Sequence, residues 1–304
     1  MPFYGQMKQN METLFGGLSK IEMTENEFDL GDGIFIRKTY AHLFAPFMMA
    51  FKPSGKYKHH DGPWKSAKGG ISFDILVEIE MPQLKEFNDN FDSEEMIWII
   101  ASLIRLSCLP YLVVSAISDI SFSKIPESEK EPTIFPYETK NRIFSPVENV
   151  KPFLSKDDLN WLKENWKRTV TLLKENSKFY SAFKAFDSAS IQGKPSTSLI
   201  NIWGAIEQLF SPNTGELKYR VSSNLAAFLQ GHGDKRLEIF KELSRLYNDR
   251  SIVAHTAKEI DFSPVVSSYI HLRNALMKII ELGFVPTQDY LEELIFKPTT
   301  KNGT

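Results

Sequence analysis

The sequence predicts an α+β fold, in which an N-terminal mixed α/β domain precedes an all-α, up-and-down helical bundle. Residues 33–122 contain short apolar or alternating runs typical of strands, with one apolar helix among them. Residues 155–296 instead carry apolar residues at helical spacing, separated by short polar loops. A stretch rich in proline and charge lies between the two patterns. We therefore expect an N-terminal domain over residues 1–125, a linker over 126–152 and a helical domain over 153–304.

Three strands are expected early in the chain, over residues 33–40, 43–52 and 71–80. The last alternates, with Ile71, Phe73, Ile75, Val77 and Ile79 on one face and Ser72, Asp74, Glu78 and Glu80 mostly on the solvent face. The polar segment 53–70 is expected to be a loop. Its lysines and aromatics can serve to touch a ligand or nucleic acid, or can simply be solvated. His59, His60 and Asp61 are expected to form no metal site, because neighbours on an extended chain point in opposite directions.

A helix is predicted to open at the capping box formed by Asp92 and Glu95, and to run from Ser93 to Cys108. It is apolar nearly all round, so we expect it to be buried. The run 96–114 is long enough to cross a membrane. Arg105 near its centre and Pro110 favour instead a buried helix followed by a strand over 110–122, so no membrane partner is predicted.

The second half of the chain reads as successive amphipathic helices with short connections. The apolar stripe of residues 235–257 should pack against other helices of the bundle. The expected helices cover residues 157–176, 178–191, 198–210, 216–230, 235–257, 264–282 and 287–296.

Composition limits the cellular compartment and the kinds of binding site that we expect. The net charge is −2, yet residues 151–304 carry 21 Lys and Arg against 17 Asp and Glu, which favours weak contact of this half with a polyanion. The single cysteine excludes an internal disulfide and a cysteine-rich zinc site. No signal peptide is recognised at the N-terminus, so a cytoplasmic location is predicted, with neither a cofactor nor a metal.

Arg250 and His255 are the candidate catalytic residues. Arginine presents a permanently charged donor fork that suits phosphate, and histidine titrates nearest neutral pH, so the two can do phosphate chemistry without a metal. His255 would act as general base toward a 2′-hydroxyl or as general acid toward the 5′-oxygen. Arg250 would hold phosphoryl oxygens in the transition state.

Three segments carry a family resemblance: LINIWGAIEQLF at 199–210, ELKYRVSSNLAAFL at 216–229 and KELSRLYNDRSIVAH at 241–255. Together they resemble the Apea-like branch of the HEPN superfamily. In that branch a helix with an aromatic and a glutamate precedes one ending in Tyr-x-x-Arg-Ser-x-x-x-His. The matching residues here are Trp203, Glu207, Tyr247, Arg250, Ser251 and His255.

The resemblance implies a metal-independent endoribonuclease that acts as a dimer in toxin or anti-phage systems. Active relatives often have Asn, Asp or His where this chain has Ser251. RNA is the implied partner, and Tyr247, Ser251, Glu207, Tyr219 and Arg220 are candidates for binding substrate or supporting the site. The expected products are a 2′,3′-cyclic phosphate and a 5′-hydroxyl. The N-terminal domain would sense a trigger or select substrate, and a regulatory partner is left open.

Helical geometry adds a condition. Five residues along a regular helix turn by about 500°, which leaves Arg250 and His255 about 140° apart. Either the helix ends between them or a second subunit completes the site, so we predict a homodimer through the helical domain.

A non-catalytic interpretation stays open. In it Arg250 pairs with Glu207, His255 sits at a helix C-terminus, and Tyr219 and Arg220 belong to a solvated face. The domain would then bind RNA, nucleotide or protein, or serve only for dimerisation. An enzyme should leave Arg250 and His255 reachable in a groove, whereas a scaffold should bury both.

Overall fold

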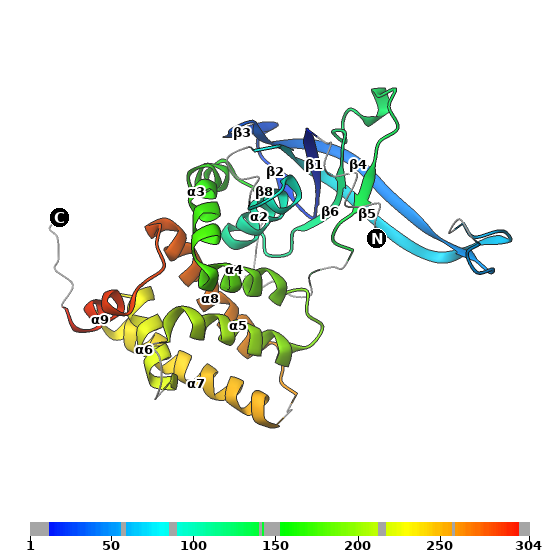
Figure 1. The fold of residues 1–304 in the computed structure, drawn as a ribbon. Helices are drawn as coiled ribbons and strands as arrows, with labels where there is room; N and C mark the ends of the chain where they lie inside the picture. The colour runs from blue at the N-terminus through cyan, green and yellow to red at the C-terminus, as the bar shows by residue number, and fades with distance from the viewer. Residues whose placement is uncertain are drawn as a thin grey trace. The chain divides into compact units, whose positions relative to one another are not determined.

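A computed structural model describes residues 12–55, 59–84, 90–139, 142, 153–211, 217–256 and 259–297. It confirms the α+β fold class, since a curled antiparallel sheet with a helix precedes a helical domain (Figure 1). The described residues fall into two compact units. Unit 1 is drawn from Met1–Trp98, Leu112–Thr139 and Pro152–Ser155, and unit 2 from Ile99–Tyr111, Lys140–Lys151 and Lys156–Thr304.

The main sheet of unit 1 has the strand order β3-β4-β5-β1-β6-β7, and every neighbouring pair is antiparallel. Its core includes Phe15, Ile75, Ala116 and Phe122. A second, two-stranded sheet pairs β2 in parallel with β8. The bounds are β1 Thr13–Ser19, β2 Glu22–Met23, β3 Glu27–Gly31, β4 Ile34–Ala50, β5 Trp64–Pro82, β6 Val113–Ser118, β7 Ile134–Pro136 and β8 Phe153–Leu154, with a 3-10 helix at Ile125–Glu127.

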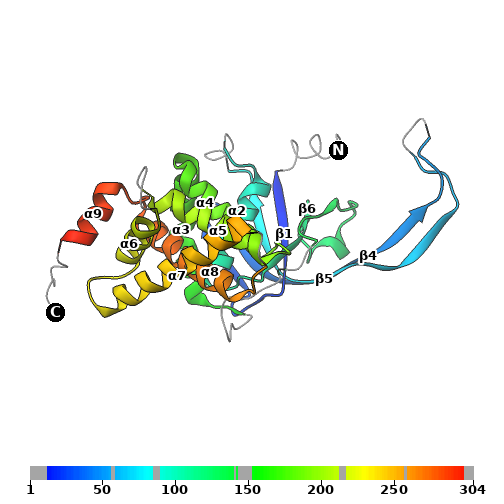
Figure 2. The same ribbon diagram turned by 90° about the horizontal axis from the view of Figure 1, so that it is seen from below.

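Strands β4 and β5 are longer than the sequence predicts. The two strands expected over 33–40 and 43–52 form one continuous β4, and part of the expected loop, Trp64–Gly70, belongs to β5. The pairing tolerates Pro46 because the register shifts immediately after it. Gly70 allows the close approach there, since a Cβ at that position would lie 2.5 Å from the Ala45 carbonyl oxygen. Figure 2 shows the resulting ribbon of β4 and β5 running out from the rest of the sheet.

Glu78 is not on a solvent face, contrary to the sequence interpretation of β5. Its side chain is 1% exposed and accepts hydrogen bonds from the Ser121 hydroxyl at 2.6 Å and the Phe122 amide at 2.9 Å. The segment after β6 covers this part of the strand, which periodicity within β5 cannot reveal. Further along, Ser72 and Asp74 are exposed as expected.

Two adjacent glycines let β1 pack closely on both sides. A Cβ on Gly16 would lie 2.6 Å from Ile97, and one on Gly17 would lie 2.8 Å from Ile75 and 2.9 Å from Phe122. We expect Gly17→Ala to lower the free energy of unfolding by about 1–3 kcal/mol through overpacking. Urea denaturation would measure this. Gly193→Ala is the matched control, because an added Cβ there meets no atom within 4 Å.

Helix α2 (Ser93–Ser107) begins at the predicted capping box. The Glu95 amide donates to Asp92 Oδ1 at 2.9 Å, and the Asp92 amide donates to Glu95 Oε2 at 3.0 Å. The helix is buried and β6 follows it, as predicted. Among the described helices, none is both long and apolar enough to cross a membrane.

Unit 2 consists mainly of helices whose apolar faces meet in one core. Trp166 and Trp203 are fully buried, and the Trp203 indole donates to the Ser268 hydroxyl at 3.0 Å. Gly283 ends α8 in the left-handed conformation, where glycine is favoured. The bounds are α3 Lys156–Glu175, α4 Ser177–Ala189, α5 Pro195–Phe210, α6 Leu217–Leu229, α7 Asp234–Thr256, α8 Ser263–Leu282 and α9 Gln288–Phe296.

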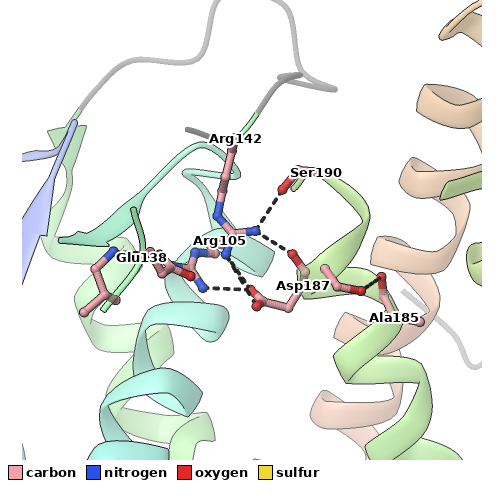
Figure 3. Close-up of polar contacts among 8 residues, drawn as sticks. Arg105, Glu138, Arg142, Ala185, Asp187 and Ser190 are labelled. Atoms are coloured by element: carbon pink, nitrogen blue, oxygen red, sulfur yellow. Dashed lines mark hydrogen bonds and ion pairs between the residues drawn. The ribbon is translucent and has the colours of Figure 1, made fainter. Parts of the chain in front are cut away.

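A buried ionic cluster lies within unit 2 (Figure 3). Arg105 Nη1 donates to Asp187 Oδ1 at 2.8 Å, while Arg142 donates to the same carboxylate at 3.3 Å, to the Asp187 carbonyl and to Ser190 at 2.8 Å. Arg105, Arg142 and Asp187 are all less than 9% exposed. Asp187 therefore neutralises charge from two arginines that come from distant parts of the sequence.

Candidate functional site

Arg250 and His255 lie on one uninterrupted helix. Helix α7 runs to Thr256, so the expectation that the helix might end between the two residues is wrong. Arg250 faces α5 and is half-buried, whereas His255 is exposed in the last turn. A single α7 thus directs the two side chains to sides about 140° apart. Among the residues that the structure describes, none forms a hydrogen bond or ion pair with His255.

Helix α5 holds Arg250 through Glu207. Arg250 Nη2 donates to Glu207 Oε2 at 3.1 Å, and the two side chains are 22% and 20% exposed. One turn before Arg250 on the same face, Tyr247 packs its ring edge-to-face on Trp203, with centroids 5.4 Å apart. Two pairs of residues thus meet where α5 contacts α7. Trp203 packs on Tyr247, and Glu207, four residues after Trp203, binds Arg250, which is three residues after Tyr247.

Tyr247 connects these groups electrostatically. Burial raises the pKa of its phenol, and the nearby Glu207 carboxylate raises that pKa further, against a smaller opposing effect of Arg250. The guanidinium carbon of Arg250 lies 5.7 Å from the centroid of the Tyr247 ring. The phenol therefore stays protonated at neutral pH and able to donate a hydrogen bond.

A cavity of about 810 Å³ opens beside this cluster, between α6 and α7. Tyr247 belongs to both the cavity lining and the Arg250 cluster. Tyr219, on the exposed first turn of α6, packs edge-to-face on Phe240 at 5.5 Å between centroids. The full lining is Leu217, Lys218, Tyr219, Phe240, Ser244 and Tyr247.

The other predicted site residues are not all gathered here. Ser251 is half-buried, one residue beyond Arg250 on α7. Arg220 is exposed on α6 and does not line the cavity, although its neighbour Tyr219 does. Sequence reasoning missed Ser244 as a lining residue. Its signal was the i, i+4, i+7 spacing of Phe240, Ser244 and Tyr247, which places the three on one helical face.

Part of the apolar stripe of α7 remains uncovered, contrary to the sequence expectation. Leu243 and Leu246 are fully buried, but Leu237 is 50% exposed and Ile252, on the last turns, is 44% exposed. Among the described residues, α5, α6 and α8 contact α7 (Figure 1) and leave Leu237 and Ile252 exposed. Separate exposed apolar side chains are common on protein surfaces, so these two do not by themselves mark an interaction site.

Neither a metal cluster nor a reactive thiol stands out. In the described ranges no group of three His, Cys, Asp or Glu residues is placed to hold a metal ion, and His59 and His60 are exposed near the tip of the β4–β5 ribbon. Burial raises the pKa of the Cys108 thiol to about 12, although a hydrogen bond from Ser107 and the charge of Arg273 oppose it.

We expect Cys108 to react with a disulfide reagent at pH 8 roughly three orders of magnitude more slowly than in the urea-unfolded chain, because so little thiolate is present. Absorbance of the released thiolate would follow both rates. Equal rates would show that the thiol is accessible and ionises normally.

The site therefore consists of a fixed arginine, a shielded tyrosine, an aromatic cavity and an exposed histidine on a second side of the same helix. An enzyme is expected to leave both residues reachable in a groove, and a scaffold is expected to bury both. The observed arrangement lies between the two, because Arg250 is paired and half-buried while His255 is exposed to solvent. Comparisons with protein-family models, curated proteins and solved structures found no match for the chain.

Proposed function

We propose that the helical domain is an Apea-like HEPN ribonuclease that cleaves RNA without a metal ion and acts as a homodimer. The observation that carries the proposal is the state of α7: Arg250 is held in place by Glu207, and His255 is exposed one and a half turns further on. Two such helices related by a twofold axis can bring the arginine of one subunit to the histidine of the other. The uncovered residues Leu237 and Ile252 supply apolar area for that contact.

The chemistry needs only proton transfer and charge stabilisation. Neutral His255 takes the proton of the 2′-hydroxyl as O2′ attacks phosphorus and the bond to O5′ breaks. A water molecule gives its proton to the departing O5′, and the His255 imidazolium returns its proton to the resulting hydroxide, which leaves a 2′,3′-cyclic phosphate and a 5′-hydroxyl. Arg250 keeps donors beyond the one bound by Glu207, and these can reach the non-bridging oxygens.

The cavity suits the rest of the substrate. Tyr219, Phe240 and Tyr247 offer rings on which a base can stack, and Lys218 offers positive charge for a phosphate. The net charge of +4 on residues 151–304 favours a polyanion in the same half of the chain.

We expect the purified chain to cut RNA in excess EDTA and to leave ends that carry cyclic phosphate and 5′-hydroxyl. The matched control is the same RNA with 2′-deoxyribose at the cleaved position, which lacks the nucleophile and should stay intact. End-labelled fragments on a sequencing gel, with kinase treatment to identify the ends, would show both results. Cleavage of the deoxy-substituted RNA, or cleavage only with added metal, would contradict the proposal.

A non-catalytic binding role is the second candidate, and the Arg250–Glu207 ion pair favours it. A half-buried pair of this kind stabilises a fold by about 1 kcal/mol or less, which is reason enough for both residues to be present. RNA bound without cleavage, with affinity reduced by Tyr219→Ala or Lys218→Ala, would support this alternative.

A further inference from the structure

The ribbon of β4 and β5 has an outer part that lacks support from the sheet. We define the β4–β5 arm as residues 40–50 and 64–74 together with the described residues of the turn between them. In the described chain, β3 pairs with β4 only as far as the Glu27–Arg37 pair, and β1 pairs with β5 only from Val77 to Pro82. Both outer edges of the arm therefore present unpaired backbone groups. Two-stranded ribbons are marginally stable in water, and open edges invite another chain.

The arm is apolar on both faces. Phe47 and Met49 alternate with Met48 along β4, and Trp64 lies opposite Ala50 on the Met48 side. The large apolar side chains are each between 47% and 68% exposed: Phe44, Phe47, Met48, Met49, Phe51 and Trp64. We name these six residues the apolar band. Within the described part of unit 1, no segment covers it.

The order of residues along the arm discriminates between partners. Residues 43–51 are nine consecutive apolar residues without a cation, whereas a nucleic-acid surface interleaves cations with its aromatics. The described residues of the turn, 52–55 and 59–63, are mostly polar and include Lys52 and Asp61, so insertion into a lipid bilayer would have to carry that charged turn in first. A protein partner can cover the apolar side chains on both faces of the arm and can pair with the backbone groups at its two open edges.

The distribution of charge in the N-terminal half of the chain indicates which protein the arm binds. Residues 40–70 carry five lysines and one aspartate, whereas the remaining residues of 1–150 carry ten Lys and Arg against twenty Asp and Glu. Five acidic residues gather in the acidic stretch, residues 22–32, which includes edge strand β3. They are Glu22, Glu25, Glu27, Asp29 and Asp32. The cationic end of an arm thus complements a surface that every copy of this chain carries.

We propose that the β4–β5 arm docks on a second copy of this chain, with its apolar band buried against the partner and its lysines over the partner's acidic stretch. By twofold symmetry each subunit gives one arm and receives one. The proposal does not rest on the ribonuclease assignment, because it concerns unit 1 alone and makes no use of Arg250 or His255.

Charge reversal on either side of the contact provides the test, measured on the full chain by sedimentation velocity over a range of concentrations. An arm variant changes Lys52, Lys65 and Lys68 to glutamate, which takes residues 40–70 from +4 to −2, and a stretch variant changes Glu22, Glu25 and Asp32 to lysine, which takes residues 22–32 from −5 to +1. We expect each variant alone to dimerise at least tenfold more weakly than the natural chain. An equimolar mixture of the two should dimerise as the natural chain does, because both arm contacts in the mixed dimer join opposite charges.

Two further variants separate charge from the apolar contribution. Phe47→Ser with Met49→Ser should weaken dimerisation and stay weak when mixed with the stretch variant. Reversing three exposed lysines of the helical domain, Lys174, Lys178 and Lys194, makes the same change in net charge and should leave dimerisation intact. Circular dichroism and melting temperature would confirm that every variant is folded.

Several results would overturn the proposal. Natural dimerisation in both charge variants would mean that the helical domain alone holds any dimer, whether or not RNA is cleaved. Weak dimerisation of the mixture would mean that the two charged regions do not meet. If reversal of the arm lysines removed only binding to single-stranded RNA or to anionic vesicles, with dimerisation unchanged, the arm's partner would be nucleic acid or membrane instead.

Discussion

Replacing Asp187 with alanine is expected to lower the free energy of unfolding by about 3–5 kcal/mol, because it removes a carboxylate to which two buried arginines donate. Arg105 and Arg142 donate to this carboxylate and are 1% and 7% exposed. Neither can lose its proton to escape the desolvation penalty. This loss is a large fraction of the roughly 5–15 kcal/mol that stabilises a typical domain, so unit 2 should unfold at a clearly lower urea concentration.

Urea denaturation of Asp187→Ala beside the natural chain would measure the loss. Asp157→Ala is the matched control: it removes an exposed aspartate from the first turn of α3, where the helix dipole contributes about 1 kcal/mol or less. An unfolding midpoint within error of the natural chain for Asp187→Ala would show that water or other groups already solvate the arginines.

Arg250→Ala and His255→Ala are each expected to reduce RNA cleavage by about 10²–10⁴-fold, yet a mixture of the two variants should regain a substantial share of the natural rate. The physical reason is the division of the site between subunits: a mixed dimer again contains one intact arginine and one intact histidine. Initial rates on a labelled RNA, after the variants have been incubated together to exchange subunits, would measure the recovery.

Arg245→Ala is a suitable control, since Arg245 lies on the same helix and is 60% exposed in its pair with Asp249. Its cleavage rate should match that of the natural chain. Each single variant should also melt near the natural temperature, because neither removes a fully buried group. No recovery in the mixture, with both variants dimeric, would place the complete site within one subunit and exclude the divided arrangement.

Much of the fold follows from local patterns. The Asp92 and Glu95 capping box places the start of α2 correctly, because the interactions involved lie within four residues. Alternation identifies the inner part of β5 but not its extension through Trp64–Gly70. That extension depends on the register with β4, a contact between segments that no single-strand pattern encodes. Glu78 is buried for a similar reason, since Ser121 and Phe122 come from another part of the chain.

The same distinction between local patterns and contacts of distant segments applies to the candidate site. Spacing on α5 and α7 suffices to suggest that Glu207 can meet Arg250, and the two form an ion pair. The burial of Arg142 and Asp187 was not foreseen, because residues around 142 read as linker and Asp187 sits in an ordinary amphipathic helix. Which carboxylate neutralises which arginine is decided by tertiary packing.

The unbroken course of α7 also bears on how the proposed activity would depend on dose. A lone chain directs Arg250 and His255 to different sides and so holds two half-sites. Below the dissociation constant of the dimer, the amount of dimer rises with the square of the chain concentration, so a doubling of the protein would quadruple the rate of RNA loss. A cell could then carry traces of the protein without harm and meet its effect abruptly once synthesis increases.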